Sequence, residues 1–222
     1  MKERPILFSA PMVRALLDGS KTQTRRVVKP QPPTTEAVRK LAGIDYSWIS
    51  PDRPGMEYHR PAGPVWAVRK LMGVEPEIRC PYGQTGDHLW VRETWRATKV
   101  ADELKPSKLA GGSCSLIWYE AQNLVPFHPS GFGKLRPSMF MPRWASRIAL
   151  EITRVRVEML QAINEIDAIA EGASWAACGS PQDGSHKAGY AQLWESINGP
   201  GSWDANPWVW VIEFKVLKGG GA

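Results

Sequence analysis

Hydrophobic positions near the N-terminus recur at the spacing of a helix, from Met12 to Leu17. Ser9 precedes them as a candidate N-cap, and Pro11 stands in the first turn, where its missing N–H costs nothing. Gly19 follows them, at a position where a left-handed residue commonly ends a helix. The pattern predicts a short helix of roughly two turns.

Polar and apolar residues alternate in several later segments, as they do in strands with one buried face. In the clearest of these, Leu89, Val91 and Glu93 share one face, and Trp90, Arg92 and Thr94 share the other. The residues from Lys21 to Val28 begin in a loop and continue as a strand that Pro30 ends. Further strands are expected at 115–121, 148–159 and 208–216.

Two more helices are expected in the second half of the chain. Asn164 is a candidate N-cap, with Asp167 at the capping-box position, and this helix ends at Glu171 and Gly172. A second helix is expected from about Ala188 to Asn198.

Prolines and glycines are dense in two other regions, at about 30–86 and 97–142, where neither a regular helix nor a central strand tolerates them. We interpret both regions as irregular insertions in one domain that spans residues 1–222. Short strands with few helices favour an α+β or barrel fold. The sequence lacks the glycine-rich motifs of nucleotide-binding folds and the Gly-x-Ser-x-Gly motif of serine hydrolases.

Composition sets the broad class of the protein. The chain has 222 residues, 43% of them hydrophobic, with a net charge of +6 that favours a phosphate-bearing or polyanionic partner. The three cysteines and four histidines show no metal-ligand spacing, so neither a metal nor another cofactor is expected. No apolar stretch is long enough for a membrane span or signal peptide, which makes the cytoplasm the expected location.

The densest group of polar side chains follows the first predicted helix, in the pattern Gly19-x-Lys21-x-x-Thr24-x-Arg26. Donors clustered at a junction between a helix and a strand can hold a phosphate or the polar edge of a base. The same residues are also compatible with a solvated first strand beside a helix end.

The segment from Leu17 to Arg26 resembles the Gly-x-Lys-x-x-x-x-Arg signature of the ASCH family, whose members have a PUA-like β-barrel. Three later segments resemble the family in the same order: a strand that starts at Gly86-Asp87, a short helix that ends in Glu171-Gly172, and the last strand, at 208–215. Residues 141–147 and 203–208 resemble segments of the longer ASCH proteins of bacteriophages and prophages. The resemblance therefore implies a PUA-like barrel with short flanking helices and proline-rich insertions.

The family includes a small bacterial hydrolase that removes the acetyl group from N4-acetylcytidine. The resemblance implies a catalytic set of Lys21, Thr24 and Glu171, with Thr24 as nucleophile, Lys21 as base or charge stabiliser, and Glu171 as acid and base. Because side chains alternate along a strand, this set requires Lys21 to precede the strand that holds Thr24. The residues expected to bind substrate or nucleic acid are Thr22, Arg25, Arg26, Arg92 and Glu93.

Two alternatives stay open at this point. The first motif is also compatible with a ribonuclease that stabilises a phosphorane, or with a non-catalytic module that binds RNA or DNA through Lys21, Arg25 and Arg26. The expected partners are accordingly a modified nucleoside, RNA or DNA. Glu171 separates these cases, because hydrolysis of an amide uses its carboxylate and binding of phosphates does not.

Overall fold

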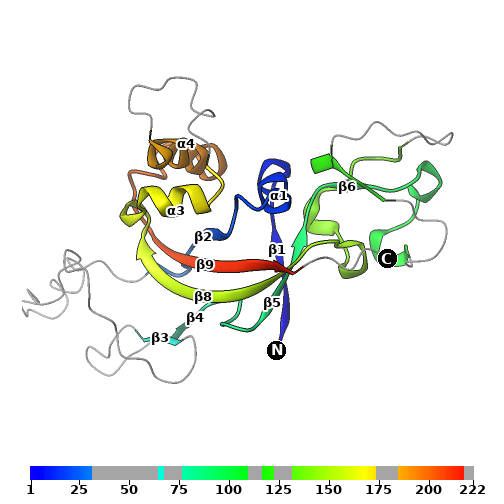
Figure 1. Ribbon diagram of the computed structural model, residues 1–222. Helices are drawn as coiled ribbons and strands as arrows, with labels where there is room; N and C mark the ends of the chain where they lie inside the picture. The colour runs from blue at the N-terminus through cyan, green and yellow to red at the C-terminus, as the bar shows by residue number, and fades with distance from the viewer. Residues whose placement is uncertain (32–64, 68–76, 110–116, 123–131, 174–184, 218–222) are drawn as a thin grey trace, which may run out of the picture.

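The structure is a computed structural model that describes residues 1–31, 65–67, 77–109, 117–122, 132–173 and 185–217 (Figure 1). Its centre is a five-stranded sheet in the order β1-β5-β8-β9-β2. Strands β1 and β5 are parallel, and the other neighbours are antiparallel. The strands are β1 (Glu3–Leu7), β2 (Gln23–Val27), β5 (His88–Arg92), β8 (Ala149–Met159) and β9 (Trp208–Leu217).

The sheet is strongly curved, and β8 and β9 bend together along most of its length (Figure 1). Their register shifts between Ile152 and Arg154, as at a β-bulge, which increases local twist and bending. Among the described residues, backbone hydrogen bonds do not join the edge strands β1 and β2, so a closed barrel is not found. A side chain crosses from one edge to the other instead, where Arg26 Nη2 donates to the carbonyl oxygen of Leu7 at 2.6 Å.

Helices cover both faces of this sheet. Alternate side chains of β9 face opposite ways, so this strand contributes to a core on each face. Helix α1 (Ala10–Leu17) packs through Val13 and Leu16 into the cluster that contains Trp210 and Ile212 of β9. Helices α3 (Glu165–Ala170) and α4 (His186–Asn198) pack on the other face, over Val209 and Val211.

The described residues between 95 and 145 contribute a lobe with its own small core. Two short strands pair there, β6 (Trp95–Arg96) and β7 (Trp118–Tyr119). Short 3-10 turns make up much of the rest: η1 (Lys99–Ala101), η2 (Pro106–Lys108), η3 (Glu120–Gln122), η4 (Ser138–Phe140) and η5 (Arg143–Ala145). The buried side chains of this core are Trp95, Ala97, Ala101, Leu109, Met141 and Ala145. A further 3-10 turn, η6 (Leu160–Ala162), follows β8.

The α+β class and the main elements agree with the sequence pattern, but several details of the pattern were wrong. Strand β1 was not expected. Only one of its five residues, Ile6, is buried, and it includes a proline, which an edge strand tolerates because half of its N–H groups need no partner. Ser9 makes no side-chain cap to α1, and α4 begins at His186, two residues before the expected Ala188.

Three other expected segments also differ. The alternating segment at 88–95 is broken between β5 and β6. Of the strand expected at 115–121, Trp118–Tyr119 is strand, while residues 115 and 116 lie outside the described residues. The region at 30–86 is not irregular throughout, since β3 (Val65–Ala67) and β4 (Glu77–Arg79) pair as antiparallel strands. Most of the remainder of that region lies outside the described residues.

Candidate functional site

Lys21 lies in the junction between α1 and β2, ahead of the strand. Gly19 has a φ of +81°, which reverses the chain after α1, and the amide of Lys21 then donates to Ala15 O at 2.9 Å. The Lys21 side chain points into the protein, and the residue is only 1% exposed. Its Nζ donates to the backbone oxygen of Glu171 at 2.8 Å and to Glu171 Oε2 at 2.9 Å. Burial lowers the pKa of Lys21, and the Glu171 carboxylate opposes that shift.

Glu171 is the C-cap of α3 and lies directly beside this junction. Gly172 follows with a φ of +74°, and a Cβ there would lie 3.0 Å from the Ala15 Cβ. Glycine at 172 therefore lets the end of α3 approach α1 closely enough for Lys21 and Glu171 to form a backbone bridge. The carboxylate is buried, with Oε2 on Lys21 and Oε1 accepting from Arg25 Nη1 at 3.1 Å.

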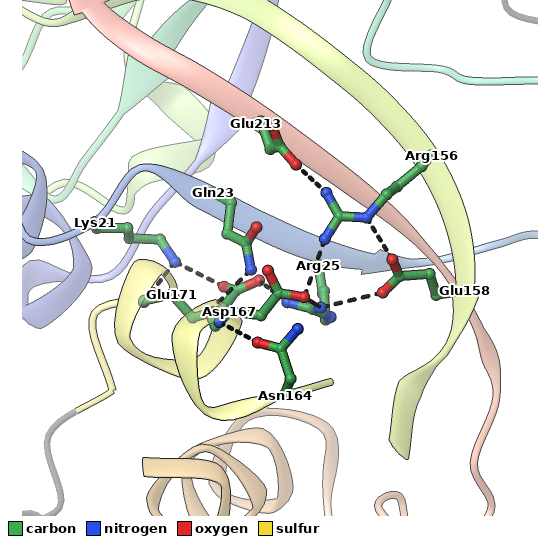
Figure 2. Close-up of polar contacts among 9 residues, drawn as sticks. All are labelled: Lys21, Gln23, Arg25, Arg156, Glu158, Asn164, Asp167, Glu171 and Glu213. Atoms are coloured by element: carbon green, nitrogen blue, oxygen red, sulfur yellow. Dashed lines mark hydrogen bonds and ion pairs between the residues drawn. The ribbon is translucent and has the colours of Figure 1, made fainter. Parts of the chain in front are cut away.

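Arg25 connects this carboxylate to a wider ion network (Figure 2). Its Nη2 lies 2.9 Å from Asp167 Oδ2 and 3.2 Å from Glu158 Oε2. Arg156 of β8 is a second centre: it lies 3.0 Å from Asp167 Oδ2 and also forms ion pairs with Glu158 and Glu213. The network thus joins four carboxylates to Lys21, Arg25 and Arg156, which balances most of the buried charge.

Two amide side chains support α3: one caps the helix, and the other joins it to β2. Asn164 accepts a hydrogen bond from the Asp167 amide at 2.8 Å and caps the helix as expected. Gln23 Nε2 donates to the backbone oxygen of Asp167 at 2.9 Å. These contacts hold the helix that carries both Asp167 and Glu171.

A small pocket of about 60 Å³ lies at the free edge of β2. Four consecutive residues of that strand line it, from Thr24 to Val27. Because neighbouring side chains of a strand face opposite ways, this is possible only at the strand's edge. The other lining residues are Glu171, Met12 of α1 and, around α4, Tyr190, Leu193, Trp194, Ile197 and Asn198.

The pocket combines a polar wall with an apolar one. Thr24, Arg25, Arg26 and Glu171 supply the polar wall, and residues of α1 and α4 supply most of the apolar one. The Nε–H groups of Arg25 and Arg26 are buried and have no acceptor in the described part of the protein. An unpaired buried donor is costly, and a ligand oxygen that reached either group after a small movement of the side chains would satisfy it.

Tyr190 links the pocket to the ion network. Its ring lies 6.0 Å from the Arg25 guanidinium carbon, within the range of a cation–π contact. Burial raises the pKa of Tyr190 well above its usual value, and the nearby Glu171 carboxylate adds to the shift. The phenol therefore stays protonated and is able to donate a hydrogen bond.

The expected site residues divide into two groups. Thr24, Arg25, Arg26 and Glu171 share the pocket, whereas Lys21 is not among its lining residues and reaches it only through the Glu171 carboxylate. Thr22 is exposed, and its backbone joins Ala170 to Phe214.

Arg92 and Glu93 are not brought to the pocket. Arg92 stacks on Trp90, with 4.6 Å from its guanidinium carbon to the ring centre. Glu93 is 1% exposed and forms a two-pronged pair with Arg147, at 2.9 and 3.0 Å. Arg147 in turn stacks on Tyr119, so Glu93 belongs to the packing of the lobe.

Other members of the site were not expected from the sequence. Arg156 and Glu158 alternate with apolar residues along β8 and carry no local motif. Tyr190 and Trp194 lie four positions apart on α4, which is the spacing of any buried helix face. Asp167 was expected only as a helix-start residue, yet its side chain is shared by Arg25 and Arg156.

Within the described residues, no group of three or more His, Cys, Asp or Glu side chains is placed to hold a metal ion. Cys80 is a free, buried thiol, and Cys114 and Cys178 lie outside the described residues. None of the helices in this part of the chain is long and apolar enough to span a bilayer. Comparisons with protein-family models, with curated proteins and with solved structures gave no match to this chain.

Proposed function

We propose that the protein is an ASCH-type hydrolase that cleaves the N4-acyl amide of an acylated cytidine in the pocket at the edge of β2. The observation that carries the proposal is that Thr24 and the buried Glu171 both line one small pocket, together with two arginines whose Nε–H groups have no acceptor among the described residues. Nucleophile, proton carrier and oxyanion donors are the parts that acyl transfer requires.

In the first half of the reaction, the Thr24 hydroxyl oxygen attacks the acyl carbon, and Glu171 accepts the hydroxyl proton. The carbonyl oxygen gains negative charge and receives hydrogen bonds from the arginine Nε–H groups. The carbon–nitrogen bond then breaks, the proton passes from Glu171 to the exocyclic nitrogen, and cytidine leaves. In the second half, Glu171 takes a proton from water and the hydroxide attacks the Thr24 ester. The bond between the acyl carbon and the Thr24 oxygen then breaks, Glu171 returns the proton to that oxygen, and the carboxylic acid leaves.

Lys21 and Arg25 hold Glu171 in this scheme. Each binds a different carboxylate oxygen, so the group has little freedom to rotate. A fixed carboxylate favours proton transfer along one direction, toward the pocket. Lys21 therefore acts through Glu171, a more indirect role than that of a base on Thr24.

A PUA-like fold is part of the proposal. Its support is the strongly curved sheet, the short α3 that ends in Glu171-Gly172, and the last strand β9 in the interior of the sheet. The contact from Arg26 to Leu7 spans the gap between the two edge strands, which a barrel would close with backbone hydrogen bonds. Nucleosides and RNA occur in the cytoplasm, which is the location we propose.

The pairing of the cations favours amide hydrolysis over binding or cleavage of a phosphate backbone. Lys21 and Arg25 are buried, and carboxylates already occupy both of them. A phosphate would have to displace these carboxylates and enter a largely desolvated network, which is costly. Of the three cations in the first motif, only Arg26 is without a carboxylate partner among the described residues.

The test is release of cytidine and acetate from N4-acetylcytidine by the purified protein, followed by chromatography. The wild type is expected to turn over, and Glu171→Gln, which keeps the shape of the side chain, is expected to lose roughly 100-fold or more. Glu103→Gln is the matched control, because Glu103 is exposed on the lobe. Folded wild-type protein that releases no cytidine would overturn the proposal.

A further inference from the structure

The volume of the pocket limits what is able to enter it. The pocket's volume of about 60 Å³ is less than half of that of a cavity that admits a benzene ring, which measures roughly 150 Å³. A pyrimidine ring is therefore too large for the pocket, while a two-carbon acyl group fits. The ring must stay at the mouth while the acyl group enters.

The chemistry of the two walls orients that acyl group. Its carbonyl belongs at the polar wall, next to Thr24 and the unpaired Nε–H groups of Arg25 and Arg26. Its alkyl end then points toward the apolar wall that Met12, Leu193 and Ile197 form with the aromatic side chains of α4. Each added methylene has to displace one of these side chains.

The side chains of that wall differ in burial, and therefore in how easily they are displaced or truncated. Trp194 and Tyr190 are each 4% exposed and belong to the core on this face of the sheet. Ile197 is 50% exposed and is the penultimate residue of α4, so its truncation opens the pocket without emptying the core.

We propose that the pocket selects short acyl groups by length, with Ile197 and Leu193 as the residues that set the limit. This inference rests on the proposed hydrolase function and specifies its substrates: N4-acetyl and similar small amides are cleaved, and long-chain amides are rejected. Rejection by one or more excess methylenes in an apolar pocket amounts to roughly 10-fold to 200-fold in kcat/KM.

The experiment compares N4-acetyl-, N4-butyryl- and N4-hexanoylcytidine as substrates of the full-length protein. For the wild type, kcat/KM is expected to fall by roughly 100-fold or more from acetyl to hexanoyl. Ile197→Ala is expected to raise the ratio of the hexanoyl to the acetyl kcat/KM about tenfold over that of the wild type. Ile166→Ala is the matched control, because Ile166 is an isoleucine of α3 that is 78% exposed and does not line the pocket.

The outcomes separate the two proposals. Equal cleavage of all three substrates by the wild type would overturn the length limit and leave the hydrolase function intact. A gain on hexanoyl substrate in Ile166→Ala equal to that in Ile197→Ala would overturn the assignment of the limit to α4. Absence of turnover on every substrate would overturn both proposals.

Discussion

At the scale of single residues, burial decides what each ionisable side chain is able to do. Lys21, Arg25 and Glu171 are each at most 3% exposed, and each is paired with an opposite charge. A charge in such surroundings is costly unless it is paired, so these residues depend on one another. Tyr190 reaches the same region as a neutral donor.

Tyr190 gives a prediction about pH. Its pKa is raised in the folded protein, so above roughly pH 10 the unfolded chain loses this proton while the folded protein retains it. The free energy of unfolding of the wild type is therefore expected to fall as the pH rises through this range. The free energy of unfolding of Tyr190→Phe is expected to fall less steeply. Urea unfolding at about pH 9 and about pH 11 measures both slopes. Parallel slopes for the two proteins would show that Tyr190 ionises freely in the folded state.

At the scale of elements, α3 is a helix of six residues that carries two carboxylates of the site. A helix this short is not stable by itself, and its position depends on its caps and on contacts with β2. Asn164 supplies the N-cap, and Gly172 permits the close approach at the other end. The geometry of Glu171 therefore depends on both ends of α3.

Loss of the Asn164 cap tests this dependence. Asn164→Ala is expected to cost about 1 kcal/mol in the free energy of unfolding and to lower kcat on N4-acetylcytidine, because Asp167 and Glu171 lose a fixed position. Ser185→Ala is the matched control, since Ser185 caps α4 in the same way through the amide of Ala188. A similar loss of kcat in both variants, measured beside their unfolding curves, would contradict a specific role for α3.

How far the sequence predicts this site depends on the range of each contact. Local signals were sufficient for Gly19, the Asn164 cap and the end of α3 at Glu171, since each acts within a few residues. The carboxylates of Glu158 and Asp167 lie 133 and 142 positions from Arg25, and no local pattern indicates such pairs.

The same limit applies to the elements of the fold. Strand β1 was not predicted because it is short, contains a proline and pairs with β5, whose residues lie 85 positions away in the sequence. Propensity alone does not favour Glu3–Leu7 as a strand.

At the scale of the whole molecule, the candidate site and the lobe are separate structures. The site uses β2, α1, α3 and α4, whereas the lobe has its own core around Trp95 and Met141. Sequence reasoning placed Arg92 and Glu93 with the site, and the structure places Glu93 in the lobe with Arg147.

Glu93 provides a test of this separation. Glu93→Ala removes the buried partner of Arg147 and is expected to lower the free energy of unfolding by about 3 kcal/mol. The KM for N4-acetylcytidine is expected to stay within about twofold of the wild type, because Glu93 does not line the pocket. Denaturant unfolding and steady-state kinetics measure the two effects. A large rise in KM without loss of stability would return Glu93 to the substrate site.

The central claim is that Thr24 attacks an acyl group in the pocket at the edge of β2. The most direct measurement is turnover of N4-acetylcytidine by Thr24→Val, which keeps the branched shape of the side chain and removes its hydroxyl, beside Thr24→Ser. The account predicts a folded Thr24→Val protein whose kcat/KM is lower by roughly 100-fold or more, with measurable turnover in Thr24→Ser. Turnover by Thr24→Val at the wild-type rate would contradict it.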